Sequence, residues 1–126
     1  MSATDYLEGK LLDHIMGIAV YTPPTSLYLA LHTNDPGEAG SANHVTGGGY
    51  VPQLITFGGQ LLSRSLSTNS QTFTNMAGGL NVTHFSIREN SSGGTPILYG
   101  ILANSRATVA GDPITFSAGL IAVSAD

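Results

Sequence analysis

The stretch from Ser26 to Thr33, SLYLALHT, has the clearest pattern of apolar positions in the chain. Leu27, Leu29 and Leu31 occupy every second position, a period typical of a β-strand, whose successive side chains point to opposite faces. The residues between them are largely apolar too. Because a strand that is apolar on both faces must be covered on both, we expect it in the interior of a sheet.

The preceding segment, residues 2–16, has a longer period. Leu7, Leu11 and Ile15 recur every four positions, which predicts one apolar stripe on an α-helix. Candidate caps stand before it and a glycine after it: Ser2, Thr4 and Gly17. Two interpretations of the stripe stay open, because it can pack on the protein's own sheet or dock on a neighbouring subunit.

The rest of the chain reads as short alternating runs separated by turn residues. Pro52 lies in the first of these runs and argues for an edge strand or a bulge there. Seven or eight short strands after one helix predict a mainly β fold, an antiparallel β-sandwich or jelly-roll-like domain with one N-terminal α-helix. We therefore expect an N-terminal docking helix at 1–17 and a single β-sandwich domain at 18–126. The runs are 50–57, 60–66, 71–75, 81–89, 97–103, 114–117 and 120–124.

A loop of about 16 residues follows the first long strand and exceeds the usual length of a connection. It holds tight-turn chemistry at its start and three consecutive glycines near its end, so we expect it to be functional or held by a partner. With the helix stripe, it supplies the residues that we predict to contact partner proteins: Leu7, Leu11, Ile15, Asp35, Glu38, Gly47, Gly48 and Gly49.

Composition narrows the classes of partner. The 126 residues include only 10% charged ones, with a formal net charge of −4 and four basic residues far apart, so direct binding of nucleic acid is not expected. No apolar run approaches the roughly 20 residues of a membrane span, and the acidic start of the chain is unlike a secretion signal. A sparsely charged surface is poorly protected against association, which favours a homo-oligomer or a component of an assembly.

The sequence holds no strong motif for catalysis or for a metal. The four histidines lack the spacing of a metal site, and Asp35 and Glu38 with Asn34 lack the twelve-residue calcium pattern. His32 and Asp35 could form a hydrolytic triad with a serine, but no GxSxG elbow is present. We therefore expect no cofactor, no metal and no enzymatic activity.

Three blocks in order, DYLEGKLLDHIMG, YTPPTSLYLALHTNDPGEAG and TGGGY, carry a resemblance to a known family. They resemble small structural proteins of tailed bacteriophages, with the pattern YLENxLLDHxxGxxxYTxPxxLYxALxTxDPxxxGxxxEVxGGGYxR. The likeness continues from VTHFSIRENSSGGTPILYGIL to the final AGLIAVSAD and covers nearly the whole chain. The chain departs from the family at Gly9, at Val51 with Pro52, and at 88–90, all in expected loops and edges or in the helix.

The resemblance implies a component of the phage particle, made in the cytoplasm of the bacterial host and located in the virion. One compact domain with a docking helix and flexible loops favours a capsid cement or decoration protein that stabilises the shell by contacts with the major capsid protein. The alternative is a tail, baseplate or fibre-attachment protein that contacts other tail or baseplate proteins. A carbohydrate-binding module on the virion is a further alternative, for which Tyr28, Tyr50 and Tyr99 are the available aromatic residues.

Overall fold

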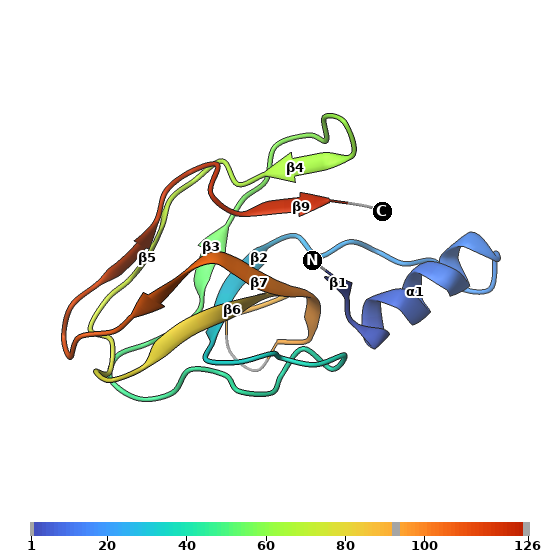
Figure 1. The fold of residues 1–126 in the computed structure, drawn as a ribbon. Helices are drawn as coiled ribbons and strands as arrows, with labels where there is room; N and C mark the ends of the chain where they lie inside the picture. The colour runs from blue at the N-terminus through green and yellow to red at the C-terminus, as the bar shows by residue number, and fades with distance from the viewer. Residues whose placement is uncertain (1, 92–93, 125–126) are drawn as a thin grey trace.

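The computed structural model describes residues 2–91 and 94–124, and it confirms a mainly β, antiparallel fold with an N-terminal helix (Figure 1). Five strands form one sheet in the order β1-β7-β6-β2-β3. Their bounds are β1 Ser2–Ala3, β7 Pro96–Ala107, β6 Asn81–Arg88, β2 Leu27–His32 and β3 Gln53–Ile55. Two further pairs of strands are β4 Arg64–Leu66 with β9 Ala122–Ser124, and β5 Gln71–Phe73 with β8 Ile114–Phe116.

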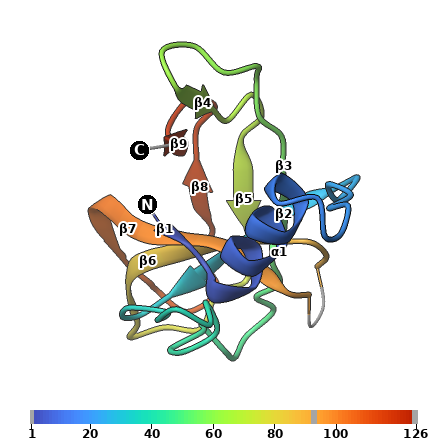
Figure 2. The same ribbon diagram turned by 90° about the vertical axis from the view of Figure 1, so that its right-hand side faces the viewer.

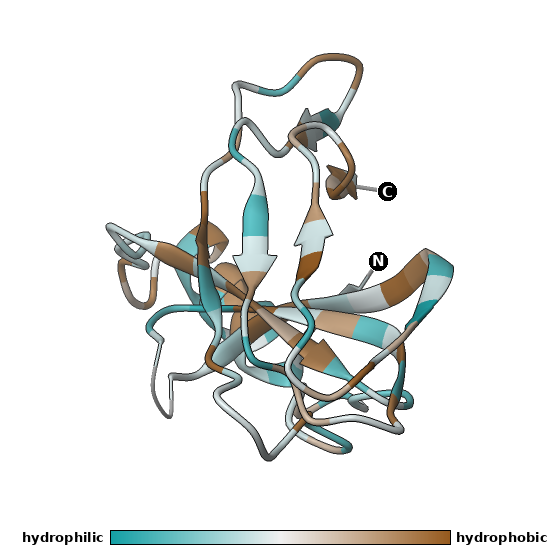
Figure 3. Ribbon diagram, turned by 90° about the vertical axis from the view of Figure 1, so that its left-hand side faces the viewer, coloured by the Kyte–Doolittle hydropathy of each residue, from teal (hydrophilic) through white to brown (hydrophobic). Residues whose placement is uncertain are grey.

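The core lies between the large sheet and the β5–β8 pair, which runs across the sheet in Figure 3. Leu29 and Leu31 of β2 are fully buried, as is Ile87 of the neighbouring β6. From the other layer, Phe73 and Phe116 close the core with their rings edge to face, 6.0 Å between centroids. β2 lies between β6 and β3, so the predicted interior position of this strand is confirmed.

Some strands begin or end at other residues than predicted, because their ends depend on backbone pairing with a neighbouring strand. The strand predicted at 97–103 continues to Ala107, because Arg106 pairs with Val82 after an irregular stretch. The run predicted at 50–57 shortens to β3, and Tyr50 instead turns its hydroxyl toward β2, where it accepts a hydrogen bond from Leu31 N at 2.9 Å. β3 ends the order of the sheet, so the edge position inferred from Pro52 is confirmed.

The long loop after β2 is held by its own chain. Val45 N donates to Leu31 O at 2.9 Å and Thr33 N donates to Asn43 O at 3.0 Å, which extends the edge of β2 beyond β3. Val45 itself is buried in the core. Backbone bonds of the kind that stabilise a sheet therefore order part of this loop within the chain itself. The expectation that the loop is functional or held by a partner stays a prediction.

Helix α1, Asp5–Ile15, follows the short β1 and begins at a buried cap. Thr4 Oγ1 accepts from Leu7 N at 3.3 Å and lies 2.9 Å from Pro96 O, so one hydroxyl joins the helix to β7. Gly17 follows the helix with φ +74°, a conformation in which glycine is favoured at a helix end. No helix in the described part of the chain is long and apolar enough to cross a membrane.

Candidate docking surface

The apolar side of α1 is largely uncovered. Leu7 alone among the helix residues is partly buried, against the core, and no helix residue is fully buried. Farther along, Ile15 is 72% exposed and Met16 68%. We call the exposed apolar residues that continue from the helix into the following segment the outer helix face: Leu11, Leu12, Ile15, Met16, Ile18 and Val20.

In residues 2–91 and 94–124, the bonds that anchor the helix to the body of the protein lie at its beginning, which explains this exposure. The Thr4 cap and the pairing of β1 with β7 hold the first turn, and Asp5 N donates to Glu38 O at 3.0 Å. The later turns project away from the body of the protein in Figure 1, and Figure 2 views the helix from that side, in front of the sheets. Of the two interpretations of the stripe, packing on the protein's own sheet therefore applies to Leu7. The outer helix face is not covered in this way.

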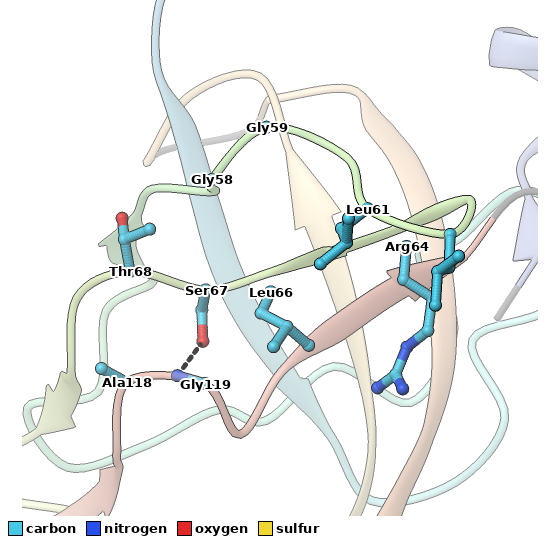
Figure 4. A pocket seen from close by; sticks show the side chains of 10 residues that line it. Gly58, Gly59, Leu61, Arg64, Leu66, Ser67, Thr68, Ala118 and Gly119 are labelled. Carbon is cyan, nitrogen blue, oxygen red and sulfur yellow. Dashed lines mark hydrogen bonds between the residues drawn. The ribbon is translucent and has the colours of Figure 1, made fainter.

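A second uncovered apolar surface surrounds the hairpin at residues 57–67, whose second arm contains β4, and the sequence patterns did not predict it. Leu61 and Leu62 at the hairpin tip are 75% and 89% exposed, and Leu66 is also exposed. Together they form the hairpin patch. It borders an open pocket of about 560 Å³, to which Ala118 and Gly119 contribute from the opposite segment (Figure 4).

Hydrogen bonds at Ser67 shape the floor of this pocket. Ser67 is buried, and its Oγ accepts from Gly119 N at 3.1 Å. Arg64 is the one charged residue that lines the pocket in the part of the chain described.

One feature of the sequence could have indicated the hairpin patch. The pair Leu61-Leu62 lies between glycines and polar residues, where a turn is normally polar.

The loop residues predicted as partner contacts lie apart from these two surfaces. Asp35 Oδ1 accepts from Gly37 N at 2.9 Å, as in an ordinary turn. The three glycines pack against residues 75–77, where Gly49 N donates to Asn75 O at 2.7 Å. Gly48 has φ +58°, and a Cβ there would lie 2.5 Å from Asn75 O, so this glycine is required by a close approach within the chain. Their role in partner contacts stays a prediction.

Three carboxylates converge beside the helix start, at Asp5, Glu8 and Glu38, with ligand atoms within 4.8 Å of one another. Sequence reasoning missed this group because Glu38 comes from the long loop. Tyr99 OH donates to Glu38, and this bond is the first cause of a raised pKa for Tyr99. All three carboxylates are exposed, and exposed acidic groups are common on proteins without a metal ion.

The polar groups that most resemble catalytic ones are buried inside the fold. His32 Nδ1 lies 2.8 Å from Ala42 O and its Nε2 lies 2.9 Å from Ser86 Oγ, so Asp35 is not its partner. Since a carbonyl only accepts, Nδ1 carries the proton and Nε2 accepts from the serine. Arg88 Nε also donates to Ser86 Oγ, at 3.3 Å. His32 and Ser86 are both 0% exposed, which leaves no access for a substrate.

Burial sets the protonation of this cluster. It lowers the pKa of His32 to about 4, and burial together with the nearby Arg88 charge lowers that of His44 to about 4. Burial raises the pKa of Tyr50 to about 12, and its hydroxyl lies 2.9 Å from His44 Nε2. At neutral pH both histidines are uncharged and act as hydrogen-bonding parts of the structure.

Comparison with known proteins shows the family of this chain. A family model described as Podophage GP4 fiber I protein gp80 matches residues 2–124. The chain belongs to this family. No curated protein matches the sequence.

Membership in the gp80 family makes the protein a structural protein of a phage virion and associates it with other virion components. The family description names a fibre protein, so it supports the alternative of a tail or fibre role better than that of capsid cement. A structural family also indicates a non-enzymatic role.

Proposed function

We propose that the protein is a non-enzymatic subunit of the tail-fibre apparatus of a podophage, attached by its N-terminal helix. In this proposal, 1–17 is the segment that carries the docking helix α1, with β1 joining it to the sheet, and 18–126 forms a single β-sandwich domain that presents it. The observation that carries the proposal is the outer helix face, an apolar surface that the chain leaves uncovered. The family description supports a fibre rather than a capsid location.

Energetics support a partner for the helix. Fully burying one aliphatic side chain is worth roughly 1.5–3 kcal/mol, so covering the outer helix face would contribute several kcal/mol to an interface. An isolated helix this short is marginal in water, and its stability comes from packing of its apolar side. We infer that Leu11 and Ile15 of the predicted contact set belong to the interface, and that Leu7 serves the protein's own core.

The test is incorporation into phage particles. Phage carrying Ile15→Glu should assemble particles that contain at least tenfold less of this protein, measured by quantitative mass spectrometry of purified virions. The matched control is Val109→Glu, an equally drastic change at a residue that is also exposed but lies on the β7–β8 connection. Equal incorporation of both variants would contradict docking through the helix.

Location is tested separately by gold-labelled antibodies against the protein on intact virions. Label on the tail supports the proposed fibre role. Capsid cement is the second candidate, favoured by the compact form of the domain and the lack of a shaft-like repeat in the sequence. Label distributed over the shell, at hundreds of copies per particle, would replace the fibre role by this second candidate.

A further inference from the structure

The hairpin patch has an unusual backbone for its sequence. The turn from Leu61 to Arg64 is closed by two bonds, Leu61 N to Arg64 O at 2.7 Å and Arg64 N to Leu61 O at 3.1 Å. Its central residues, Leu62 and Ser63, have φ of +53° and +61°. Turns with two such residues strongly prefer Asn-Gly, and a leucine is strained there.

Leu62 gains no compensating burial within its own chain, since it is 89% exposed. A local rule broken without a gain in the folded chain is characteristic of a functional position. The neighbouring Leu61 and the pocket extend the same apolar surface. The hairpin patch is therefore suited to receive an apolar surface from outside the chain.

The outer helix face is such a surface. The net charge of its helix is opposite in sign to the charge beside the hairpin patch. Helix α1 has three acidic residues and one lysine, which gives −3 + 1 = −2 with His14 neutral. Between 58 and 68 the one charged residue is Arg64. Asp13 precedes Met16 by one helical turn and so borders the outer helix face, as Arg64 borders the pocket. Opposite charges at the rims of two apolar surfaces favour their pairing.

The two surfaces lie on different parts of one copy: in Figure 1 the hairpin that leads into β4 is at the top and α1 is at the right. We propose that the outer helix face of one copy of this chain packs on the hairpin patch of a second copy, with Asp13 of one facing Arg64 of the other. Because each copy carries both halves, the contact can be reciprocal in a two-fold pair or repeated around a ring. This inference deepens the proposed function by naming a partner for the docking helix.

The first experiment measures the mass of the purified full chain by light scattering and analytical ultracentrifugation. The wild type should exceed the 13.0 kDa of one chain and dissociate on dilution. Ile15→Glu and Leu62→Glu should each weaken association at least tenfold, whereas the control Val109→Glu should leave it unchanged. Circular dichroism should show the same β signal in all four proteins, because every substituted side chain is exposed.

The decisive experiment mixes the two defective variants. Ile15→Glu retains an intact hairpin patch and Leu62→Glu an intact outer helix face. Differently labelled samples of the two should therefore associate with each other more tightly than either variant associates with itself. Asp13→Arg and Arg64→Asp should each weaken self-association, and the two changes in one chain should restore it.

A wild type that stays monomeric at high concentration would overturn the inference. So would a mixture that stays monomeric, which would indicate helix-to-helix pairing or a foreign partner. With either of these two results, the proposed function would still be supported if Ile15→Glu fails to enter virions. Conversely, normal self-association with no incorporation into particles would reject the proposed function alone.

Discussion

The β2 strand and helix α1 are both rich in leucine, yet their apolar residues have opposite fates. Leu29 and Leu31 of β2 are 0% exposed, whereas the outer helix face is open to solvent. β2 is flanked by strands on both sides, whereas the bonds that attach α1 to the fold, among the residues described, come from its cap and first turn. The difference separates residues that stabilise the single chain from residues whose burial requires another molecule.

The largest effect should come from the buried side of this comparison. Leu31→Ala should lower the free energy of unfolding by roughly 2–5 kcal/mol, because it removes packing contacts and leaves a cavity in the core. Urea denaturation at low protein concentration measures this. A loss below about 1 kcal/mol would show that the core around β2 is less tightly packed than the structure indicates.

The next effect concerns the two neutral histidines, His32 at the end of β2 and His44, which pairs with it from the long loop. Their pKa values in the fold lie near 4, below the ordinary 6.5, so the unfolded chain binds more protons between these values. The unfolding free energy should therefore be flat above about pH 6.5 and fall as pH decreases toward about 4, by on the order of 3 kcal/mol for His32.

Denaturation curves between pH 5 and pH 7 test this, because carboxylates stay largely ionised in that range. His44→Gln should flatten part of the dependence and leave the share of His32. A stability that rises on acidification would contradict the burial of both rings as neutral groups.

A smaller effect should arise where the two regions join. Thr4→Ala removes the helix cap and the hydroxyl contact with Pro96 O, and should cost about 1–2 kcal/mol of unfolding free energy. Thr4→Ser keeps the hydroxyl and should retain most of it. Equal losses in both variants would mean that the methyl group of Thr4, rather than its hydroxyl, anchors the helix.

The smallest effect on the single chain should come from the exposed side of the comparison. Leu12→Ala, the same change as Leu31→Ala, should alter the unfolding free energy of the dilute protein by less than about 0.5 kcal/mol. At higher concentration the deficit should grow, because association stabilises only the wild type. A large loss in the dilute protein would instead place Leu12 in the chain's own core.

Residue patterns located most of the fold. Alternation found β2 and the strands at 81–89 and 114–117 within a residue or two, and the four-residue period found the helix with Thr4 as a candidate cap. These features depend on the geometry of single elements, which repeats along the sequence. Element ends set by pairing were less well predicted, as at Ala107, because a strand continues as long as its neighbour supplies partners.

The candidate site was predicted in part. The apolar stripe with Leu11 and Ile15 was found from the sequence, but whether the chain covers it depends on how the first turn is anchored to β7. The hairpin patch had no periodic signal, since Leu61 and Leu62 lie in a turn. The same alternation or spacing describes a buried and an exposed leucine equally well.

The sequence by itself determined the strand content of this protein, the amphipathic helix, the interior place of β2 and the likeness to phage structural proteins. Only the tertiary structure decided which apolar residues stay uncovered, that the long loop is held by its own sheet, and that His32 meets Ser86 rather than Asp35. The physical reason is that periodicity records the orientation of side chains along one element. Burial depends on what distant parts of the chain place against that element.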